Sequence, residues 1–323
     1  MDNAFNSQFN VVLVTGANGF VGQSLCKRLF QQGQAVCAVV RSSSTQVDNN
    51  ESIAVGDIKG HTDWTKALQD VKVVVHLAAR VHVMNEMTDD PLAEFRKINV
   101  EGTLNLARQA FKAGVSRFIY ISSIKVNGEF TDPGCPFRAD DAPQPMDPYG
   151  ISKREAEDGL RQLAKDTGLE VVIIRPPLIY GLGVKANFLS MMRWLHKGIP
   201  LPLGSINNAR SLVALDNLVD LIVTCIQHPA AANQTFLVSD GEDISTTDLL
   251  KKTAVAMGVN ARLIPVPDIL IKVGGKLLGK GDVVQRLCGN LQVDITKAQQ
   301  LLGWAPPISV QEGLRRAVAT IAQ

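Results

Sequence analysis

The sequence lacks long apolar runs, closely spaced cysteines and a marked excess of one charge. No apolar run approaches the roughly 18 residues of a membrane-spanning helix, so we expect no membrane insertion. A formal net charge of +2 gives no reason to expect nucleic acid as a partner. The five cysteines form no Cys-x-x-Cys pair, and the first ten residues lack a signal-peptide pattern. We therefore expect a cytoplasmic protein without a metal site.

A glycine-rich turn follows the first apolar stretch of the chain, which spans residues 11–14. Gly16, Gly19 and Gly22 recur at intervals of three, and an amphipathic helical pattern begins beside them. Without a Cβ atom, the backbone of such a turn can approach a ligand closely, and the free N–H groups of the helix favour an anion. The order of strand, turn and helix predicts a pyrophosphate-binding turn of a dinucleotide site rather than an ordinary strand–helix connection.

The second predicted strand, over residues 35–40, is followed by a basic residue, Arg41. An acidic residue at this place would bind the ribose hydroxyls of NAD, whereas an arginine can pair with the 2′-phosphate of NADP. We therefore expect NADP or NAD as the cofactor, with NADP favoured; a solvated arginine is the alternative. Asp57 lies near the end of a short strand over 53–58, where it could accept a hydrogen bond from adenine or cap a turn.

Strand and helix patterns then alternate through the first half of the chain. The predicted order is a helix over 63–71, a strand over 73–75, a helix over 92–112, a strand over 118–121, a helix from 149 to about 166 and a strand over 170–175. This alternation predicts an α/β fold with a Rossmann-type, doubly wound parallel sheet, which binds its ligands at the carboxyl ends of the strands.

Small and polar residues occupy these strand ends. Ala78 and Ala79 leave room for a cofactor to lie against the end of the strand before them. His76, at the same strand end, is expected to be a hydrogen-bonded structural histidine rather than an acid or a base. Asn99 lies among apolar residues of a predicted helix, so it needs hydrogen-bond partners if it is buried.

Ser123, Tyr149 and Lys153 carry the predicted chemistry. Ser123 ends a strand, while Tyr149 and Lys153 are four residues apart and share one face of a helix. A phenol with an ordinary pKa near 10 exchanges a proton near neutrality only if that pKa falls by roughly 2–3 units. The lysine ammonium and the positive charge of an oxidised nicotinamide favour the phenolate, and the serine hydroxyl can bind the substrate oxygen.

The alternation loosens after Pro177, where the sequence indicates a smaller and less regular domain. We predict a dinucleotide-binding Rossmann domain over residues 1–176 and a mixed α/β substrate domain over residues 177–323. The segment of about 234–258 begins with a strand pattern that could return to the first sheet.

Seven motifs together carry a resemblance to a known family. They are Thr15-Gly-Ala-Asn-Gly-Phe-Val-Gly22, Gly56-Asp57-Ile58, His76-Leu-Ala-Ala79, Asn99-Val-Glu-Gly102, Ser122-Ser123, Tyr149 to Lys153, and Arg175-Pro-Pro-Leu-Ile-Tyr-Gly181. The chain resembles an extended short-chain dehydrogenase/reductase of the UDP-galactose 4-epimerase or NAD-dependent epimerase/dehydratase group. The resemblance implies that Ser123 and Tyr149 handle the substrate hydroxyl, while Lys153 holds the nicotinamide ribose. It implies cofactor contacts from Gly16, Asn18, Gly19, Phe20, Gly22, Arg41, Asp57, Ile58, Leu77, Ala78, Ala79, Asn99, Tyr149 and Lys153.

The same resemblance implies a UDP-sugar as the substrate. Asn187 and Arg210 match positions that bind the nucleotide diphosphate, and Arg286 is a second candidate for that contact. Ser123 and Lys125 are expected to bind the sugar. The residues around Lys125 resemble a bacterial subgroup that is associated with N-acetylated UDP-sugars for surface polysaccharide and contains 4-keto reductases as well as epimerases.

Two outcomes share hydride transfer at C4 of a UDP-hexose or UDP-N-acetylhexosamine. Arg41 favours reduction of a 4-keto UDP-sugar by NADPH. The alternative is a UDP-sugar 4-epimerase, which retains NAD and returns the hydride to the opposite face of the sugar. A non-catalytic dinucleotide sensor is the third and least favoured interpretation, because the intact set of Ser123, Tyr149 and Lys153 argues against it. Whether the chain forms a homodimer is left open.

Overall fold

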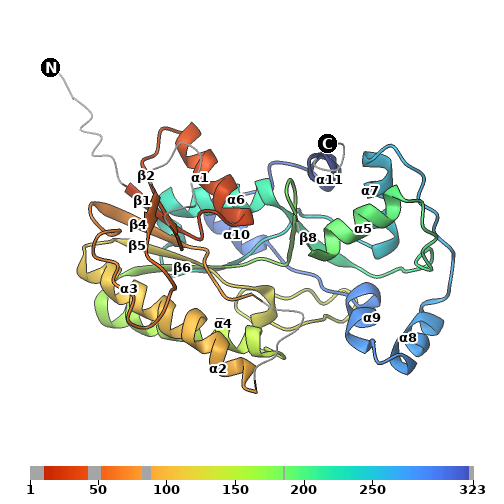
Figure 1. The fold of residues 1–323 in the computed structure, drawn as a ribbon, viewed down its shortest axis with the longest axis horizontal. Helices are drawn as coiled ribbons and strands as arrows, with labels where there is room; N and C mark the ends of the chain where they lie inside the picture. Colours follow the sequence, from red (N-terminus) through yellow and green to blue (C-terminus); the bar gives the residue numbers. More distant parts are fainter. Residues whose placement is uncertain (1–10, 43–51, 82–88, 185, 320–323) are drawn as a thin grey trace. The chain divides into compact units, whose positions relative to one another are not determined.

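The computed structural model describes residues 11–42, 52–81, 89–184 and 186–319 (Figure 1). The chain divides into two compact units, each assembled from separate stretches of sequence. Unit 1 comprises Met1–Asn127, Ala142–Arg175 and Leu221–Phe236, and unit 2 comprises Gly128–Asp141, Pro176–Asp220 and Leu237–Gln323. The chain therefore passes from one unit to the other several times.

Unit 1 is built on a seven-stranded sheet of order β3-β2-β1-β4-β5-β6-β9. The strands are β1 (Val11–Thr15), β2 (Val36–Val40), β3 (Ser52–Ala54), β4 (Val71–His76), β5 (Arg117–Ile121), β6 (Glu170–Arg175) and β9 (Thr235–Leu237). Neighbouring strands from β3 to β6 are all parallel. The order reverses between β1 and β4, which is the switch point where open α/β sheets bind ligands. The predicted doubly wound parallel sheet is confirmed.

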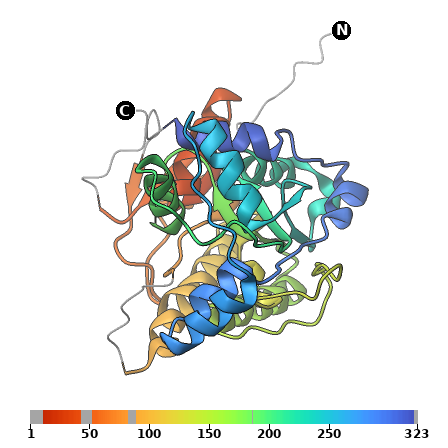
Figure 2. The same cartoon turned by 90° about the vertical axis from the view of Figure 1, so that its right-hand side faces the viewer.

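Helices cover both faces of this sheet (Figures 1 and 2). One face carries α2 (Pro91–Arg96), the π-helical segment η1 (Lys97–Gly102), α3 (Thr103–Lys112) and α4 (Pro148–Thr167); the other carries α1 (Phe20–Gln31) and the part of α6 (Leu215–Gln227) that belongs to unit 1. The central strands can be apolar throughout because neither of their faces meets water. Short 3-10 turns, η2 (Ile124–Val126) and η3 (Pro229–Ala231), complete the unit.

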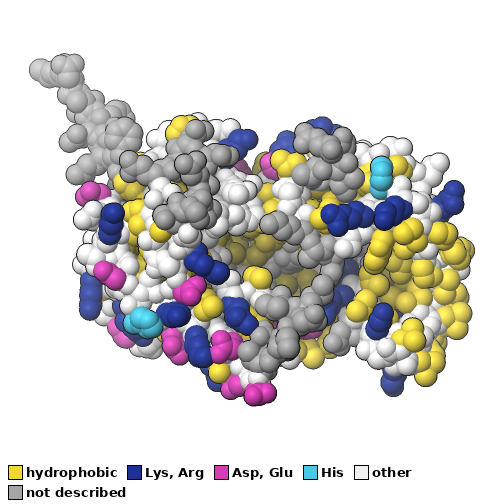
Figure 3. Space-filling model, in the orientation of Figure 1, with side chains coloured by type: hydrophobic (Ala, Val, Ile, Leu, Met, Phe, Trp, Pro, Cys, Tyr) yellow, Lys and Arg dark blue, Asp and Glu magenta, His cyan; other side chains and the backbone are white. Residues whose placement is uncertain are grey.

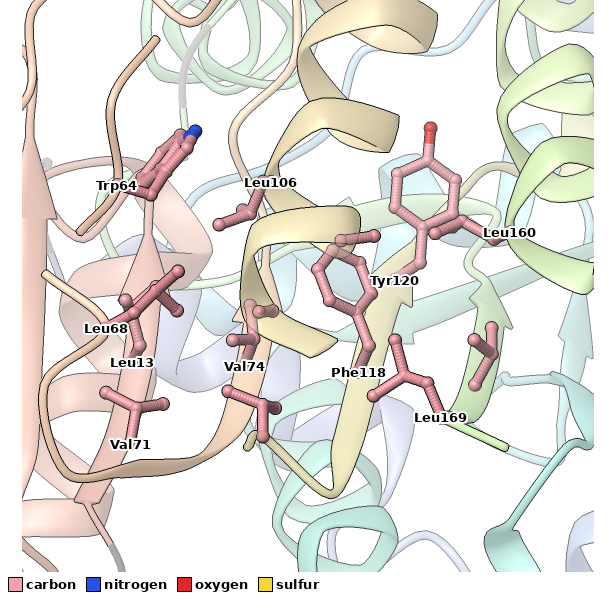
Figure 4. Packing of buried hydrophobic residues seen from close by; sticks show 14 of the residues in the cluster. Leu13, Trp64, Leu68, Val71, Val74, Leu106, Phe118, Tyr120, Leu160 and Leu169 are labelled. Atoms are coloured by element: carbon pink, nitrogen blue, oxygen red, sulfur yellow. The ribbon is translucent and has the colours of Figure 1, made fainter. Parts of the chain in front are cut away.

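The core of unit 1 lies between the sheet and the layer of α3 and α4 (Figure 4). Leu13, Val74 and Phe118 point from the strands toward Leu106 of α3 and Leu160 of α4, and all five side chains are fully buried. Each such side chain stabilises the fold by about 1.5–3 kcal/mol relative to leaving it in water. This packing fixes where β4, β5 and α4 end, and therefore where the polar residues at those ends lie.

Residues 63–71 do not form the predicted helix. The Asp63 carboxylate accepts hydrogen bonds from the backbone N–H and the hydroxyl of Thr65, and Gln109 of α3 accepts the N–H of Trp64. Asp70 has a left-handed backbone with φ of 59°. These side chains bind N–H groups at the start of the segment, as at the start of a helix, but the chain makes only turns before β4. The apolar spacing that suggested a helix instead places Trp64 in the core.

Unit 2 contains a three-stranded sheet of order β10-β8-β7 and most of the remaining helices. β7 (Leu178–Tyr180) is parallel to β8 (Arg210–Ala214), and β10 (Asp243–Ile244) is antiparallel to it. The helices are α5 (Ala186–His196), α7 (Thr246–Ala256), α8 (Asp268–Leu277), α9 (Gly281–Cys288), α10 (Thr296–Leu302) and α11 (Val310–Val318). Of the segment 234–258, only the first strand, β9, joins the large sheet, while α7 belongs to unit 2.

A buried carboxylate organises the centre of unit 2. Asp240 accepts hydrogen bonds of 2.7 Å from the Ala214 N–H, from Nδ2 of Asn217 and from the Tyr180 hydroxyl. Burial raises the pKa of Asp240, and these donors oppose the rise. No helix within the described ranges is long and apolar enough to cross a membrane.

Candidate active site

The glycine-rich turn joins β1 to α1, and at Gly16 and Gly22 the neighbouring backbone leaves no space for a side chain. Gly16 has a φ of 64°, and a Cβ atom there would lie 3.1 Å from the backbone nitrogen of Ala78. A Cβ atom on Gly22 would lie 2.1 Å from the carbonyl oxygen of Gly16, so the turn and the helix are in backbone contact. Asn18 is exposed in the turn, and Phe20 is the first residue of α1.

The start of α1 has the properties of an anion site. Gly19 occupies the N-cap position without a side-chain cap, and the first turn contains no acidic residue. The N–H groups of a first helical turn have no partner within the helix, so they can donate to a phosphate. The bare glycine cradle and the uncapped helix start fit the pyrophosphate of a nicotinamide dinucleotide.

The end of β4 is held against this turn by a buried hydrogen-bond chain. The hydroxyl of Thr15 accepts the backbone N–H groups of Leu77 and Ala78, each at 3.2 Å, and lies 2.7 Å from Nδ1 of His76. Because that oxygen already accepts two protons, we assign its own proton to Nδ1, which leaves the Nε2–H to donate to Thr103 at 3.0 Å. Burial lowers the pKa of His76 to about 3, so the ring is neutral. The histidine is therefore structural, and it holds Leu77, Ala78 and the following Ala79 in place.

Asn99 is buried and uses its side chain to fix two other segments. Its Oδ1 accepts the N–H of Arg80 at 2.8 Å, and its Nδ2 donates to the Arg80 carbonyl at 3.1 Å and to the Ser152 hydroxyl at 3.0 Å. Ser152 in turn donates to the backbone carbonyl of Tyr149 at 2.8 Å. Asn99 thus links the chain after β4 to the first turn of α4, and its predicted contact with the cofactor stays a prediction.

The structure brings Arg41 and Asp57 together as an exposed ion pair. Nε of Arg41 lies 3.4 Å from Oδ1 of Asp57, and their side chains are 79% and 58% exposed. At this exposure the pair contributes little to stability, so the guanidinium can exchange its partner for a ligand phosphate. Ile58 packs against Gly102 of η1, where a Cβ atom would lie only 2.6 Å from its side chain.

The predicted catalytic side chains meet at the carboxyl end of β5. The Ser123 hydroxyl lies near enough to the Tyr149 hydroxyl to lower the pKa of that phenol. Lys153, one turn further along α4, is 2% exposed and donates to the carbonyl of Ile121 at 2.8 Å. Its Nζ lies 5.9 Å from the centre of the Tyr149 ring. Phe95 packs edge-on against that ring at 5.9 Å and helps to orient it.

The protein's own groups keep Tyr149 protonated. Burial raises the pKa of its hydroxyl well above 10, the negative charge of Asp147 raises it further, and the hydrogen bond with Ser123 opposes both. Burial also lowers the pKa of Lys153 to about 7, although Glu157 opposes this fall. The lysine therefore does not by itself lower the pKa of the tyrosine as the sequence led us to expect, because desolvation outweighs its charge.

Lys125 lies beside this group and neutralises one of its charges. Its ammonium forms an ion pair with Asp147, the residue that caps α4, and the second oxygen of Asp147 accepts the N–H of Gly150 at 2.7 Å. Both side chains are partly buried. The predicted sugar contact of Lys125 is untested, but its position reduces the effect of Asp147 on the neighbouring Tyr149.

A buried ionic network behind the site was missed from the sequence. Arg175, at the end of β6, donates to both carboxylate oxygens of Glu157, at 2.9 and 2.5 Å, and to Oδ1 of Asn127 at 2.9 Å. Asn127 follows the short turn after Ser123, so the network ties that turn to α4 and β6. The available signal was the spacing of Tyr149, Lys153 and Glu157, which places all three on one helix face at intervals of four.

The predicted diphosphate residues all lie in unit 2. Arg210 begins β8, donates to the carbonyl of Gly289 at 3.1 Å and pairs with no carboxylate among the described residues. Burial lowers its pKa, so the guanidinium is partly desolvated without a counter-charge. Arg286 is exposed in α9, and Asn208 donates to the carbonyls of Leu287 and Gly289, which joins that helix to the start of β8. Asn187 lies in α5, but its side chain is outside the described residues.

The fold and this site define an enzyme of the extended short-chain dehydrogenase/reductase class. Residues 12–239 match the NAD dependent epimerase/dehydratase family, and the chain belongs to that family. It is 51% identical to a UDP-glucose 4-epimerase of Vibrio cholerae over 313 residues, which cover 97% of this chain and 95% of the relative.

Solved structures of similar proteins share the fold over nearly the whole chain. MoeE5, solved with UDP-glucuronic acid and NAD, is 25% identical with a TM-score of 0.78 and covers 97% of this chain and 99% of its own. A UDP-glucose 4-epimerase of Thermotoga maritima, solved with UDP-glucose, is 24% identical with a TM-score of 0.77 and covers 97% and 98%. The nicotinamide dinucleotide expected from the glycine turn agrees with the NAD bound in MoeE5, whereas a preference for NADP has no such support.

Proposed function

We propose that the chain is a 4-epimerase of a UDP-hexose or UDP-N-acetylhexosamine that retains its nicotinamide cofactor. The observation that carries the proposal is the grouping of Ser123, Tyr149 and Lys153 at the end of β5, with Lys153 Nζ 5.9 Å from the Tyr149 ring centre, in a chain 51% identical to a UDP-glucose 4-epimerase. The reductase outcome, which Arg41 favours in the sequence, draws no specific support from the relatives.

The chain's own residues divide the chemistry between them. A nicotinamide dinucleotide bound here would supply a hydride acceptor for C4 and, in its oxidised form, a positive charge. Ser123 binds the C4 oxygen of the sugar, and Tyr149 accepts the hydroxyl proton and later returns it. Lys153 holds the nicotinamide ribose, and the glycine turn holds the pyrophosphate. Because the protein alone keeps Tyr149 neutral, its role as a base depends on the cofactor's charge.

In this proposal, unit 2 recognises the nucleotide. Arg210, partly buried and without a carboxylate partner in the described ranges, binds the diphosphate by charge-assisted hydrogen bonds, and Arg286 and Asn187 add further contacts. Lys125 contacts the sugar near the reacting carbon. The cytoplasmic location stays a prediction, and whether the chain forms a homodimer stays open.

Reduction of a 4-keto UDP-sugar by NADPH is the second candidate. Its support is Arg41, which lies after β2 where a 2′-phosphate would bind and pairs with the exposed Asp57. Both candidates use the same three catalytic side chains, so the difference between them lies in whether the cofactor is retained or consumed.

Isotope retention at C4 separates the two candidates. UDP-glucose and UDP-N-acetylglucosamine carrying deuterium at C4 are incubated with the purified protein and NAD, and the products are followed by NMR. We expect the C4 epimer to form with its deuterium retained and without net change in nicotinamide absorbance. Stoichiometric oxidation of NADPH by a 4-keto UDP-sugar, without any epimerisation, would establish the reductase instead. If neither reaction occurs, the proposed function is wrong.

A further inference from the structure

The α8–α9 pair carries an exposed apolar surface in unit 2. Its side chains are about half to four-fifths exposed, and we call them the α8–α9 surface: Ile269, Leu270, Val273, Leu277, Leu278 and Val283. Leu277 and Leu278 are 82% and 75% exposed. In Figure 3, apolar side chains gather over the part of the molecule where Figure 1 shows these two helices. Single exposed apolar residues are ordinary on proteins, whereas a contiguous group indicates a binding surface.

This surface is the outward side of a closely packed helix pair. Gly275 of α8 is buried, and a Cβ atom there would lie 2.1 Å from the side chain of Val284 in α9. Gly279, with φ of 67°, ends α8, and the next N–H, of Lys280, bonds back to the Gly275 carbonyl at 2.8 Å. The two helices already bury their facing sides against each other, so the exposed row is not an incomplete contact between them.

Lysines border the apolar row on α8. Ile269, Val273 and Leu277 recur at intervals of four along one side, and Lys272 and Lys276 recur at the same interval on the adjacent side. Lys272 is neutralised by Asp268 at 2.8 Å, whereas Lys276 and Lys280 have no acidic partner among the described residues. Residues 268–288 contain four basic and two acidic side chains, so the surface is apolar with a net positive border.

We propose that the α8–α9 surface docks on a membrane whose surface contains anionic lipids. The apolar side chains of the α8–α9 surface enter the boundary between head groups and acyl chains, and Lys276 and Lys280 lie at the level of the lipid phosphates. Lysine suits this position because its stem can lie along apolar surface while its ammonium stays in water. Contact is peripheral, since α8 has 10 residues and a spanning helix needs about 20.

The positive border favours a lipid surface over a second copy of the chain. In a twofold interface the same patch faces itself, so Lys276 and Lys280 of one copy would approach the same lysines of the other. Like charges brought together at a dry interface oppose association, whereas an anionic bilayer supplies the opposite charge. The proposal does not depend on the proposed function, because its test measures binding alone.

Vesicle co-sedimentation tests the proposal. The full chain is mixed with vesicles of phosphatidylcholine alone or of phosphatidylcholine with an equal amount of phosphatidylglycerol. We expect binding to the anionic vesicles that weakens with added salt. The affinity for anionic vesicles should fall at least about tenfold in each of two double variants, Leu277→Ser/Leu278→Ser and Lys276→Glu/Lys280→Glu. Val255→Ser, at a 74% exposed apolar position on α7, is the matched control and should bind like the wild type.

Circular dichroism shows whether each variant is folded. If the leucine variant does not fold, the charge variant alone still tests the proposal. Absence of wild-type binding to anionic vesicles would overturn the proposal, and so would equal binding by the charge variant. Light scattering that shows a wild-type dimer and a monomeric leucine variant, without vesicle binding, would assign the surface to contact between copies and would also overturn it.

Discussion

The change Glu157→Gln tests whether the buried network behind the site supports the fold. Glu157 has no exposed side-chain surface, and its two oxygens receive three donors, two from Arg175 and one from Arg161. Arg175 itself is 1% exposed. Glutamine keeps the shape but removes the charge, and its amide N–H₂ faces a guanidinium that can only donate. The arginine would then be a buried cation without a counter-charge.

The expected cost is large compared with the stability of a domain. Removing one partner of a buried ion pair typically destabilises a protein by about 3–5 kcal/mol, since the other charge stays desolvated. Typical unfolding free energies are about 5–15 kcal/mol, so the variant should lose a substantial fraction of its stability. Because Arg175 also holds Asn127, the turn after Ser123 should lose order with the network.

Urea unfolding followed by circular dichroism measures the cost, and Glu155→Gln is the matched control on the same helix. Glu155 pairs with Arg96, but the two side chains are 32% and 46% exposed. Such a surface pair is worth about 0–1 kcal/mol, so the control should unfold almost like the wild type. If Glu157→Gln is no less stable than Glu155→Gln, the buried ion pair contributes no more to the free energy of unfolding than the surface pair, and the reasoning fails.

Four further outcomes follow from the site. Tyr149→Phe should lower turnover by about 10²–10⁴-fold while cofactor binding is kept, and near-normal turnover would refute its role as acid and base. Arg41→Asp should shift cofactor affinity toward NADH in titrations of both variants with both cofactors, and tighter NADH than NADPH binding by the wild type would contradict a preference for NADP. Arg210→Ala should weaken UDP binding in calorimetry by about 2–4 kcal/mol and leave cofactor affinity unchanged. In the unfolded chain Lys153 keeps its proton up to the ordinary lysine pKa of 10.5, whereas in the folded protein it loses the proton near pH 7. Between these two values the unfolded state binds more protons, so the free energy of unfolding of the wild type should rise with pH relative to that of Lys153→Met. The same pH dependence in both proteins would contradict the lowered pKa.

The sheet of unit 1 was predictable because its signals are local. Apolar runs mark the strands, and several are followed by a turn and an amphipathic helix, as at β1, Gly16 and α1. The segment 63–71 was not predictable in this way, since its apolar spacing matches a helix although the chain makes only turns there. Apolar spacing records that a residue is buried, but not which backbone partner it finds.

The candidate site shows the same division between local and distant information. Tyr149 and Lys153 share a helix face, so their proximity follows from spacing alone. The pairing of Arg41 with Asp57, and of Lys125 with Asp147, depends on how separate segments come together, which spacing does not encode. The sign of the Tyr149 pKa shift was equally inaccessible, because it depends on how much water the fold removes from the hydroxyl.

The interleaved course of the chain has a consequence for its synthesis on the ribosome. Strand β9 and the end of α6 are made after residues 176–220, which belong to the other unit. Until they emerge, β6 is an unprotected sheet edge, and Arg117 lacks the carbonyls of Cys225 and His228 to which it donates at 2.7 and 2.9 Å. Domains usually complete folding one after another during translation. Here the sheet of unit 1 is completed only after β9 has been synthesised. Fragments that end near Arg175 should therefore aggregate through the exposed edge of β6.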